Sequence, residues 1–102
     1  MKIVDIEVIR FKTKTRNYPT KWGYYYWGDE RDGSSSITRI VTDEDAVGYN
    51  LGGDQATMDR VVKPLLVGEN PLDREKLWHW MDQHPGFSEG LAGSIDCALW
   101  DL

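Results

Sequence analysis

The chain has a single cysteine and no long apolar run, and these two absences exclude several classes of protein. Cys97 has no partner within the chain for a disulfide, and its apolar neighbours predict a small buried thiol. The N-terminus alternates charged and apolar residues, so it lacks the continuous apolar run of a signal peptide, and no stretch approaches a membrane span. We therefore expect a cytoplasmic protein with no membrane partner.

Positive charge is also scarce. Lys and Arg together number 12 against 17 Asp and Glu, which gives a formal net charge of −5. Nucleic acids and anionic membranes are bound through clustered Lys and Arg. The one basic cluster, Lys12, Lys14 and Arg16, is short and is explained by a solvated strand end and loop. No nucleic-acid partner is expected.

Familiar catalytic and metal-binding patterns are missing as well. His79 and His84 are five residues apart across a helix end, so they cannot form the i, i+4 pair of a zinc site. The three acids Asp43–Asp45 fall in a turn without calcium-loop spacing, and the glycines of Gly48–Gly53 lack the Lys-Ser or Lys-Thr of a nucleotide loop. We therefore expect no catalytic residue and no metal ligand in the chain.

At 102 residues the chain is about one small domain, and its N-terminal half predicts three strands. Alternation of Val4, Ile6 and Val8 with acids indicates a half-buried strand that runs on toward Phe11. Between Thr13 and Ser36 no period survives, which predicts a long loop with room for a short strand inside it. The two later strands are expected over Ser36–Thr42 and Ala46–Asn50, joined by a tight polar turn.

The C-terminal half predicts about three helices. Asp54 is placed to cap the first, which Pro64 should kink or tighten in its last turn. Asn70-Pro71 should start the second and Ser88-Glu89 the third. The expected inner faces are Leu77, Trp78 and Met81 on the second helix and Leu91, Ile95, Leu99 and Leu102 on the third. The fold class is therefore α+β, a three-stranded antiparallel meander followed by a helical bundle.

The segment from Trp22 to Trp27 places five large rings in six positions, more than a solvent-facing loop needs. Such rings pack under a partner domain, stack on a sugar face or line a small-molecule pocket. The residues leave these alternatives open.

The end of the chain, Gly93-Ser94-Ile95-Asp96-Cys97-Ala98-Leu99-Trp100-Asp101-Leu102, resembles the segment that joins cap to barrel in the mandelate racemase and muconate lactonizing group of the enolase superfamily. Lys63–Pro71 with Leu77-Trp78 is similar to the helix pair of that family, and Val41–Gly48 to its hairpin. The Gly52-Gly53 pair stands where the family more often has glycine followed by glutamate.

The resemblance implies an N-terminal capping domain over residues 1–91, with residues 92–102 beginning the helix that leads into a (β/α)8-type barrel. Family members abstract the proton next to a carboxylate, with Mg2+ bound by the barrel and a barrel lysine or histidine as base. The cap supplies two loops that close over the substrate. Carried over by position, the substrate-binding residues are Tyr18, Trp22, Tyr24, Tyr25, Tyr26, Trp27 and Asn50.

The first functional hypothesis is thus the specificity cap of an acid-sugar dehydratase, a homo-oligomer whose partners are a small carboxylate or sugar acid and its own barrel. The alternatives are a racemase, epimerase or cycloisomerase of the same superfamily, or a stand-alone carbohydrate-binding module that uses the aromatic loop. The 102 residues alone are expected to be catalytically silent. They are also expected to be marginally stable, because Leu91, Ile95, Leu99 and Trp100 would lack part of their packing surface.

Overall fold

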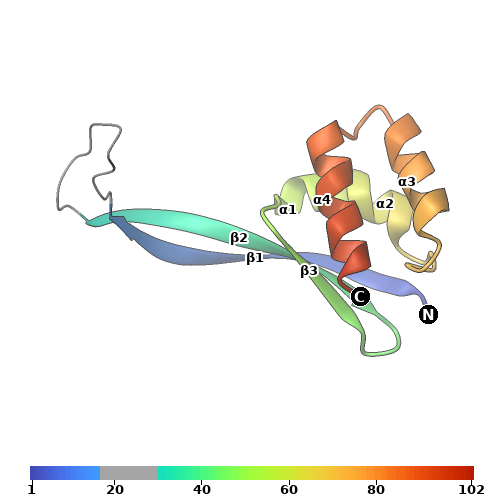
Figure 1. Cartoon of the computed structure of the whole chain (residues 1–102), viewed down its shortest axis with the longest axis horizontal. Helices are drawn as coiled ribbons and strands as arrows, with labels where there is room; N and C mark the ends of the chain where they lie inside the picture. Colours follow the sequence, from blue (N-terminus) through green and yellow to red (C-terminus); the bar gives the residue numbers. More distant parts are fainter. Residues whose placement is uncertain (17–29) are drawn as a thin grey trace, which may run out of the picture.

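A computed structural model describes residues 1–16 and 30–102, apart from the side chains at positions 15, 16, 30 and 31. Three antiparallel strands, β1 (Ile3–Arg16), β2 (Glu30–Thr42) and β3 (Val47–Leu51), lie in the order β1-β2-β3. The helices cover one face of this sheet, while β1 and β2 continue together as a ribbon that projects from the body (Figure 1). The α+β prediction is confirmed.

The projecting ribbon, residues 10–16 and 30–36, is called the arm below. The sequence predicts a loop from Thr13 to Ser36, which is wrong at both ends because the ladder continues as far as the pair Arg16 and Glu30. β3 pairs with β2 only from Ile37 to Val41, so the arm has two strands. Neither face of the arm carries a regular pattern of apolar residues. The two strands are held together by backbone hydrogen bonds, and these leave no periodic signal in the sequence.

A β-bulge near the start of β1 changes which residues face the helices. Ile3 pairs with Thr42 and Asp5 with Val41, so Val4 is the extra residue. Ile3 and Ile6 are consequently both buried, although they are three residues apart. The sequence pattern places Val4 on the inner face, and this is wrong, since Val4 is 49% exposed.

The first helical segment is continuous but irregular: α1 (Gln55–Thr57), the π-helical η1 (Met58–Val62) and α2 (Lys63–Leu66). The backbone N–H of Lys63 bonds to the carbonyl of Met58, five residues earlier. Pro64 has no N–H and its ring crowds the carbonyl four residues before it. The expected tightened turn is therefore wrong, because a widened turn precedes the proline.

The second helix, α3 (Arg74–Gln83), begins later than the sequence predicts. The Asn70 side chain accepts a hydrogen bond of 3.0 Å from the Leu72 N–H, which makes the Asn70-Pro71 segment a turn instead of a first helical turn. Leu77 and Met81 are buried as expected, whereas Trp78 is 41% exposed and does not belong to the inner face.

The third helix, α4 (Glu89–Trp100), starts as predicted, with the Ser88 hydroxyl accepting from the Leu91 N–H at 3.1 Å. Ile95 and Leu99 are fully buried, so the expectation that they lack a packing surface is wrong, while Trp100 is 65% exposed. Cys97 is exposed, contrary to the predicted buried thiol, because the buried stripe of α4 passes on the other side.

The core lies between the sheet and the helices, and both the strands and the helices contribute residues to it. The buried core residues are Ile3, Ile6, Ile40, Met58, Val62, Leu66, Leu77, Met81, Ala92, Ile95, Ala98 and Leu99.

No helix within residues 1–16 and 30–102 is long and apolar enough to cross a membrane.

Gly48→Ala tests the closest contact in this core. A Cβ at Gly48 would overlap the carbonyl oxygen of Ala98 and lie 3.0 Å from Cγ of Leu102, so β3 and α4 would have to separate. Overpacking of this kind destabilises proteins by about 1–3 kcal/mol, and urea unfolding should show that loss.

Gly93→Ala is the matched control. It adds the same methyl group to α4 at a position where a Cβ would have no heavy atom within 4 Å. Alanine is the better helix former by about 1 kcal/mol, so this variant should be more stable than the natural chain. Equal stability of the two variants would contradict the close packing at Gly48.

Candidate functional site

The β3–α1 loop, Asn50–Gln55, is fixed to β2 by three hydrogen bonds. The Gly52 N–H donates to the Ser36 carbonyl at 2.7 Å. The Thr38 hydroxyl donates to the Gly52 carbonyl at 2.8 Å, and the Ser36 hydroxyl donates to the Gly53 carbonyl at 3.0 Å. The loop is therefore held against the helix-facing side of the sheet, next to the base of the arm.

Two glycines determine the backbone conformation of this loop. Gly52 and Gly53 have φ angles of 90° and 116°, a region that side chains disfavour. A Cβ at Gly53 would also overlap the Thr38 hydroxyl and lie 3.4 Å from Cγ2 of Val8. The glycines thus allow the backbone to approach the sheet closely, which agrees with a turn that needs glycine geometry.

Asp54 and Gln55 complete the connection. Asp54 is the helix cap that the sequence predicts, and its carboxylate accepts from the Thr57 hydroxyl at 2.9 Å and the Thr57 N–H at 3.2 Å. These bonds lower the pKa of Asp54 below its usual value, and the Arg10 charge adds to the effect. The side-chain oxygen Oε1 of Gln55 accepts a hydrogen bond from the Val8 N–H at 2.8 Å, which joins the helix to β1.

Asn50, a predicted substrate contact, lies at the start of this loop. Its side-chain nitrogen donates to the Ser94 hydroxyl at 2.8 Å and to the Leu51 carbonyl at 3.3 Å. The Asn50 amide therefore ties the loop to α4. The six predicted aromatic contacts lie outside the described residues: Tyr18, Trp22, Tyr24, Tyr25, Tyr26 and Trp27.

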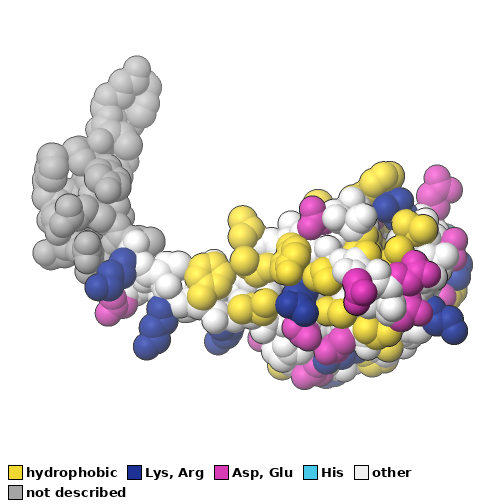
Figure 2. Space-filling model, turned by 90° about the horizontal axis from the view of Figure 1, so that it is seen from below, with side chains coloured by type: hydrophobic (Ala, Val, Ile, Leu, Met, Phe, Trp, Pro, Cys, Tyr) yellow, Lys and Arg dark blue, Asp and Glu magenta, His cyan; other side chains and the backbone are white. Residues whose placement is uncertain are grey.

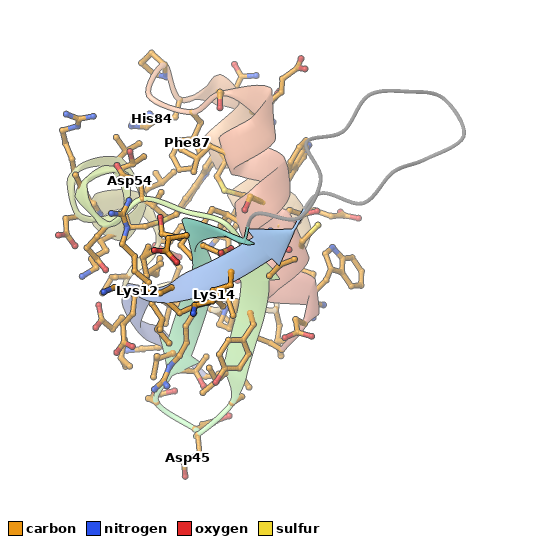
Figure 3. All side chains as sticks on the ribbon, turned by 90° about the vertical axis from the view of Figure 1, so that its left-hand side faces the viewer. Lys12, Lys14, Asp45, Asp54, His84 and Phe87 are labelled. Atoms are coloured by element: carbon orange, nitrogen blue, oxygen red, sulfur yellow. The ribbon has the colours of Figure 1, made fainter. Side chains whose placement is uncertain are left out.

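A row of cations continues from this loop along the arm. Val8, Arg10, Lys12 and Lys14 alternate along β1, so they share one face of the strand. Val8 faces Gly53, and Arg10 is close enough to lower the pKa of Asp54. Figure 3, which looks along the arm toward the body, shows Lys12 and Lys14 on the arm below Asp54.

Hydroxyls and one acid stand opposite the cations on β2. Arg10 pairs with Ser36, Lys12 with Ser34 and Lys14 with Asp32. A hollow of about 500 Å³ lies at this point of the arm. The sequence predicts that Lys12, Lys14 and Arg16 form a solvated strand end and loop, although their spacing of two residues is already that of one strand face. The residues that line the hollow are Lys12, Thr13, Lys14, Asp32, Gly33 and Ser34.

The sheet face turned away from the helices is apolar in its central part. Figure 2, seen from below, shows hydrophobic side chains that run from the body onto the arm. Ile9, Ile37 and Leu51 occupy one cross-strand row there, with Tyr49 and Phe11 beside them. Next to the arm, one face of the sheet is therefore cationic and the other is apolar.

Metal binding finds no support in the described part of the chain. Among residues 1–16 and 30–102, no three His, Cys, Asp or Glu side chains come together in a way that could hold an ion. The Mg2+ that the resemblance implies therefore does not fit these residues.

No family model matches the chain. The D-xylonate dehydratase of Haloferax volcanii is 37% identical to it over 67 residues, 62% of this chain and 16% of that protein. The N-succinyl-L-Arg/Lys racemase of Bacillus cereus is 28% identical over all of this chain and 30% of its own length. The chain therefore spans less than a third of either relative.

Solved structures agree with these relatives. The D-glucarate dehydratase of Agrobacterium tumefaciens, complexed with magnesium, matches the whole chain over 29% of its own length, with a TM-score of 0.78 and 29% identity. Together these matches confirm the resemblance to the enolase superfamily and to its N-terminal capping domain. Its relatives include both acid-sugar dehydratases and racemases.

Asp54, the N-terminal cap of helix α1, makes a pH-dependent contribution to the free energy of unfolding. Because its pKa is lowered in the folded chain from 3.8, the contribution is complete above that value and is lost as the pH falls through the folded pKa. Asp54→Ala should lower the urea midpoint at pH 7, and its difference from the natural chain should shrink below pH 3.8.

Asp54→Ser is the control, since serine also caps helices but does not titrate in this range. It should retain most of the stability at pH 7 and remove this part of the acid dependence. An unchanged acid dependence in both variants would show that the Asp54 cap contributes nothing.

Proposed function

We propose that this chain is the substrate-specificity cap of an enzyme that abstracts the α-proton of a carboxylate substrate, with an acid-sugar dehydratase as the first candidate. The observation that carries the proposal is the placement of the anchored loop Asn50–Gln55 beside the base of the arm, on one side of the sheet. Carried over by position, the two loops that close over the substrate in the resembled family are residues 15–33, which include the far end of the arm, and residues 50–55.

In this proposal the described residues bind and orient the substrate but do not react with it. The loop is held by backbone and hydroxyl bonds to β2, so it presents a fixed wall. A wall of this kind excludes water from a charged intermediate. The base and the ligands of any Mg2+ belong to a barrel in the remainder of the protein, and residues 92–102 lead into it.

The dehydratase is placed first because of the relatives. The D-xylonate dehydratase and a D-galactonate dehydratase family member from Halomonas elongata are 37% and 32% identical over 62% and 63% of this chain, whereas the racemase is 28% identical over all of it. A racemase, an epimerase or a cycloisomerase uses the same first step, so the products of the reaction distinguish these alternatives.

The full-length protein tests the proposed reaction directly. It is incubated with sugar acids and N-acylated amino acids in deuterated water with Mg2+, and NMR follows the α-proton and the products. A dehydratase exchanges or loses this proton and releases a keto acid, whereas a racemase exchanges it without loss of water. The chain of 102 residues alone should give neither result. A full-length protein that neither exchanges the α-proton nor forms a keto acid from any of these acids would overturn the proposal.

A pair of variants distinguishes a substrate-binding role of Asn50 from a purely structural one. Asn50→Ala and Ser94→Ala both remove the 2.8 Å hydrogen bond between β3 and α4. If Asn50 also contacts the substrate, Asn50→Ala should raise KM by about tenfold more than Ser94→Ala, the effect of one lost hydrogen bond to a ligand. Equal kinetic effects would assign Asn50 to the structure alone.

A further inference from the structure

The outer edge of β3 is closed by side chains of α4 instead of another strand. β3 lies at one edge of the sheet, so the backbone N–H groups that point away from β2 have no strand to bond to. One of them, the Tyr49 N–H, donates to the carboxylate of Asp101 at 2.9 Å. Figure 1 shows the C-terminal end of α4 beside this strand. Asp101 thus takes the place of a carbonyl from a neighbouring strand.

Asp101 belongs to a stripe of α4 that faces β3. Ser94, Ala98 and Asp101 are separated by four and three residues, the spacing that puts residues on one face of a helix. The Ser94 hydroxyl accepts from the Asn50 amide at 2.8 Å, and the Ala98 carbonyl lies where a Cβ of Gly48 would be. Consecutive residues of β3 are therefore held by one face of α4, directly before the loop begins.

The helix itself does not explain an acid at this position. Asp101 is the C-terminal cap of α4, where the helix dipole leaves partial negative charge, and the last turn of α4 has no basic residue to compensate. The carboxylate therefore opposes the local preference of its own helix. A residue that breaks a local rule in this way indicates a role elsewhere in the structure, and the bond to Tyr49 supplies that role.

The loop Asn50–Gln55 is held from two sides. On one side Ser36 and Thr38 bond to its glycines and fix it to the sheet. These bonds do not fix the loop relative to α4, which in the proposed enzyme leads into the barrel. The bond from Tyr49 to Asp101 joins the strand before the loop to the end of that helix. Asp101 thus helps to set the place of the loop relative to the barrel.

We infer that Asp101 is a positioning residue for substrate binding: its carboxylate holds the backbone of Tyr49, and through it the loop Asn50–Gln55, at a fixed place relative to α4. Asp101 itself does not touch the substrate. The inference rests on the proposed function, since it assigns what orients one wall of the same site. A loop displaced at this end fits the substrate less well, and the loss falls on binding because the reacting groups belong to the barrel.

Two substitutions in the full-length protein test this role. Asp101→Ala removes the acceptor, whereas Asp101→Asn keeps a side-chain carbonyl that can accept from the Tyr49 N–H. The substrates are D-xylonate, D-galactonate, D-glucarate and N-succinyl-L-lysine. Asp101→Ala should raise KM by about tenfold and change kcat by less than about twofold, the effect of one hydrogen bond lost in binding. Asp101→Asn should bring KM back to within about threefold of the natural value.

Asp82→Ala is the matched control, because Asp82 is also an exposed acid in the last turn of a helix, α3. Its carboxylate accepts from the neighbouring Gln83 side chain at 3.4 Å, a contact within α3. Both substitutions remove the same charge from the same kind of position. Asp82→Ala should therefore leave KM and kcat unchanged, which separates the bond to β3 from net charge and from the helix dipole.

Amide hydrogen exchange of the full-length protein gives a readout that does not depend on catalysis. Asp101→Ala should speed exchange in the peptide that spans residues 47–55, because the Tyr49 N–H loses its acceptor. Exchange in the peptides of α3 should stay unchanged, which shows that the variant is folded. Asp101→Asn and Asp82→Ala should both exchange as the natural protein does.

The outcomes separate the two proposals. Turnover with an unchanged KM in Asp101→Ala would overturn the positioning role and leave the proposed function intact. Equal impairment of Asp101→Asn and Asp101→Ala would also overturn it, as would faster exchange throughout α3, which would assign Asp101 to stability alone. A natural protein that neither exchanges the α-proton nor forms a product from any of the four acids would overturn both proposals.

Discussion

The contact between β3 and α4 at Gly48 is the constraint on which the rest of the structure depends. Because Gly48 has no side chain, the backbone of α4 at Ala98 lies directly against the strand. Two further bonds follow from this closeness, one from the Tyr49 N–H to the Asp101 carboxylate at 2.9 Å and one from Asn50 to Ser94. The end of β3, and with it the start of the loop, is thereby placed by the last helix.

The same geometry extends from the loop to the arm. Once Asn50 is fixed, Gly52 and Gly53 lie across β2 and bond to Ser36 and Thr38. These two strand residues pair with Arg10 and Val8, so the base of the arm and the loop form one rigid corner. A two-stranded ribbon is marginal in water by itself, and the three-stranded part of the sheet supports it here.

Sequence reasoning succeeds where a pattern reflects one dominant interaction. The caps at Asp54 and Ser88 follow from side-chain chemistry, and the stripe of Ile95 and Leu99 from burial on one face of a helix. It fails where two effects compete. Val4 is misplaced because a bulge interrupts the period of two, and Trp78 because the helix presents only a narrow buried face.

The candidate site divides in the same way. The loop from Asn50 to Gln55 is recognisable from its glycines and the family resemblance, but its attachment to Ser36 and Thr38 depends on strand register. The arm could not be predicted, because its polar residues have no apolar alternation and its pairing is a backbone property. The spacing of two residues between Arg10, Lys12 and Lys14 places them on one face of a strand, but the loop predicted from Thr13 onward excluded Lys14 from that strand.

The place of the cations on an arm, instead of on the body, has an electrostatic consequence. In the chain alone Lys12 and Lys14 are exposed, and 0.1 M salt largely screens their attraction for an anion beyond about 10 Å. The same charges attract a carboxylate several times more strongly once water is excluded around them.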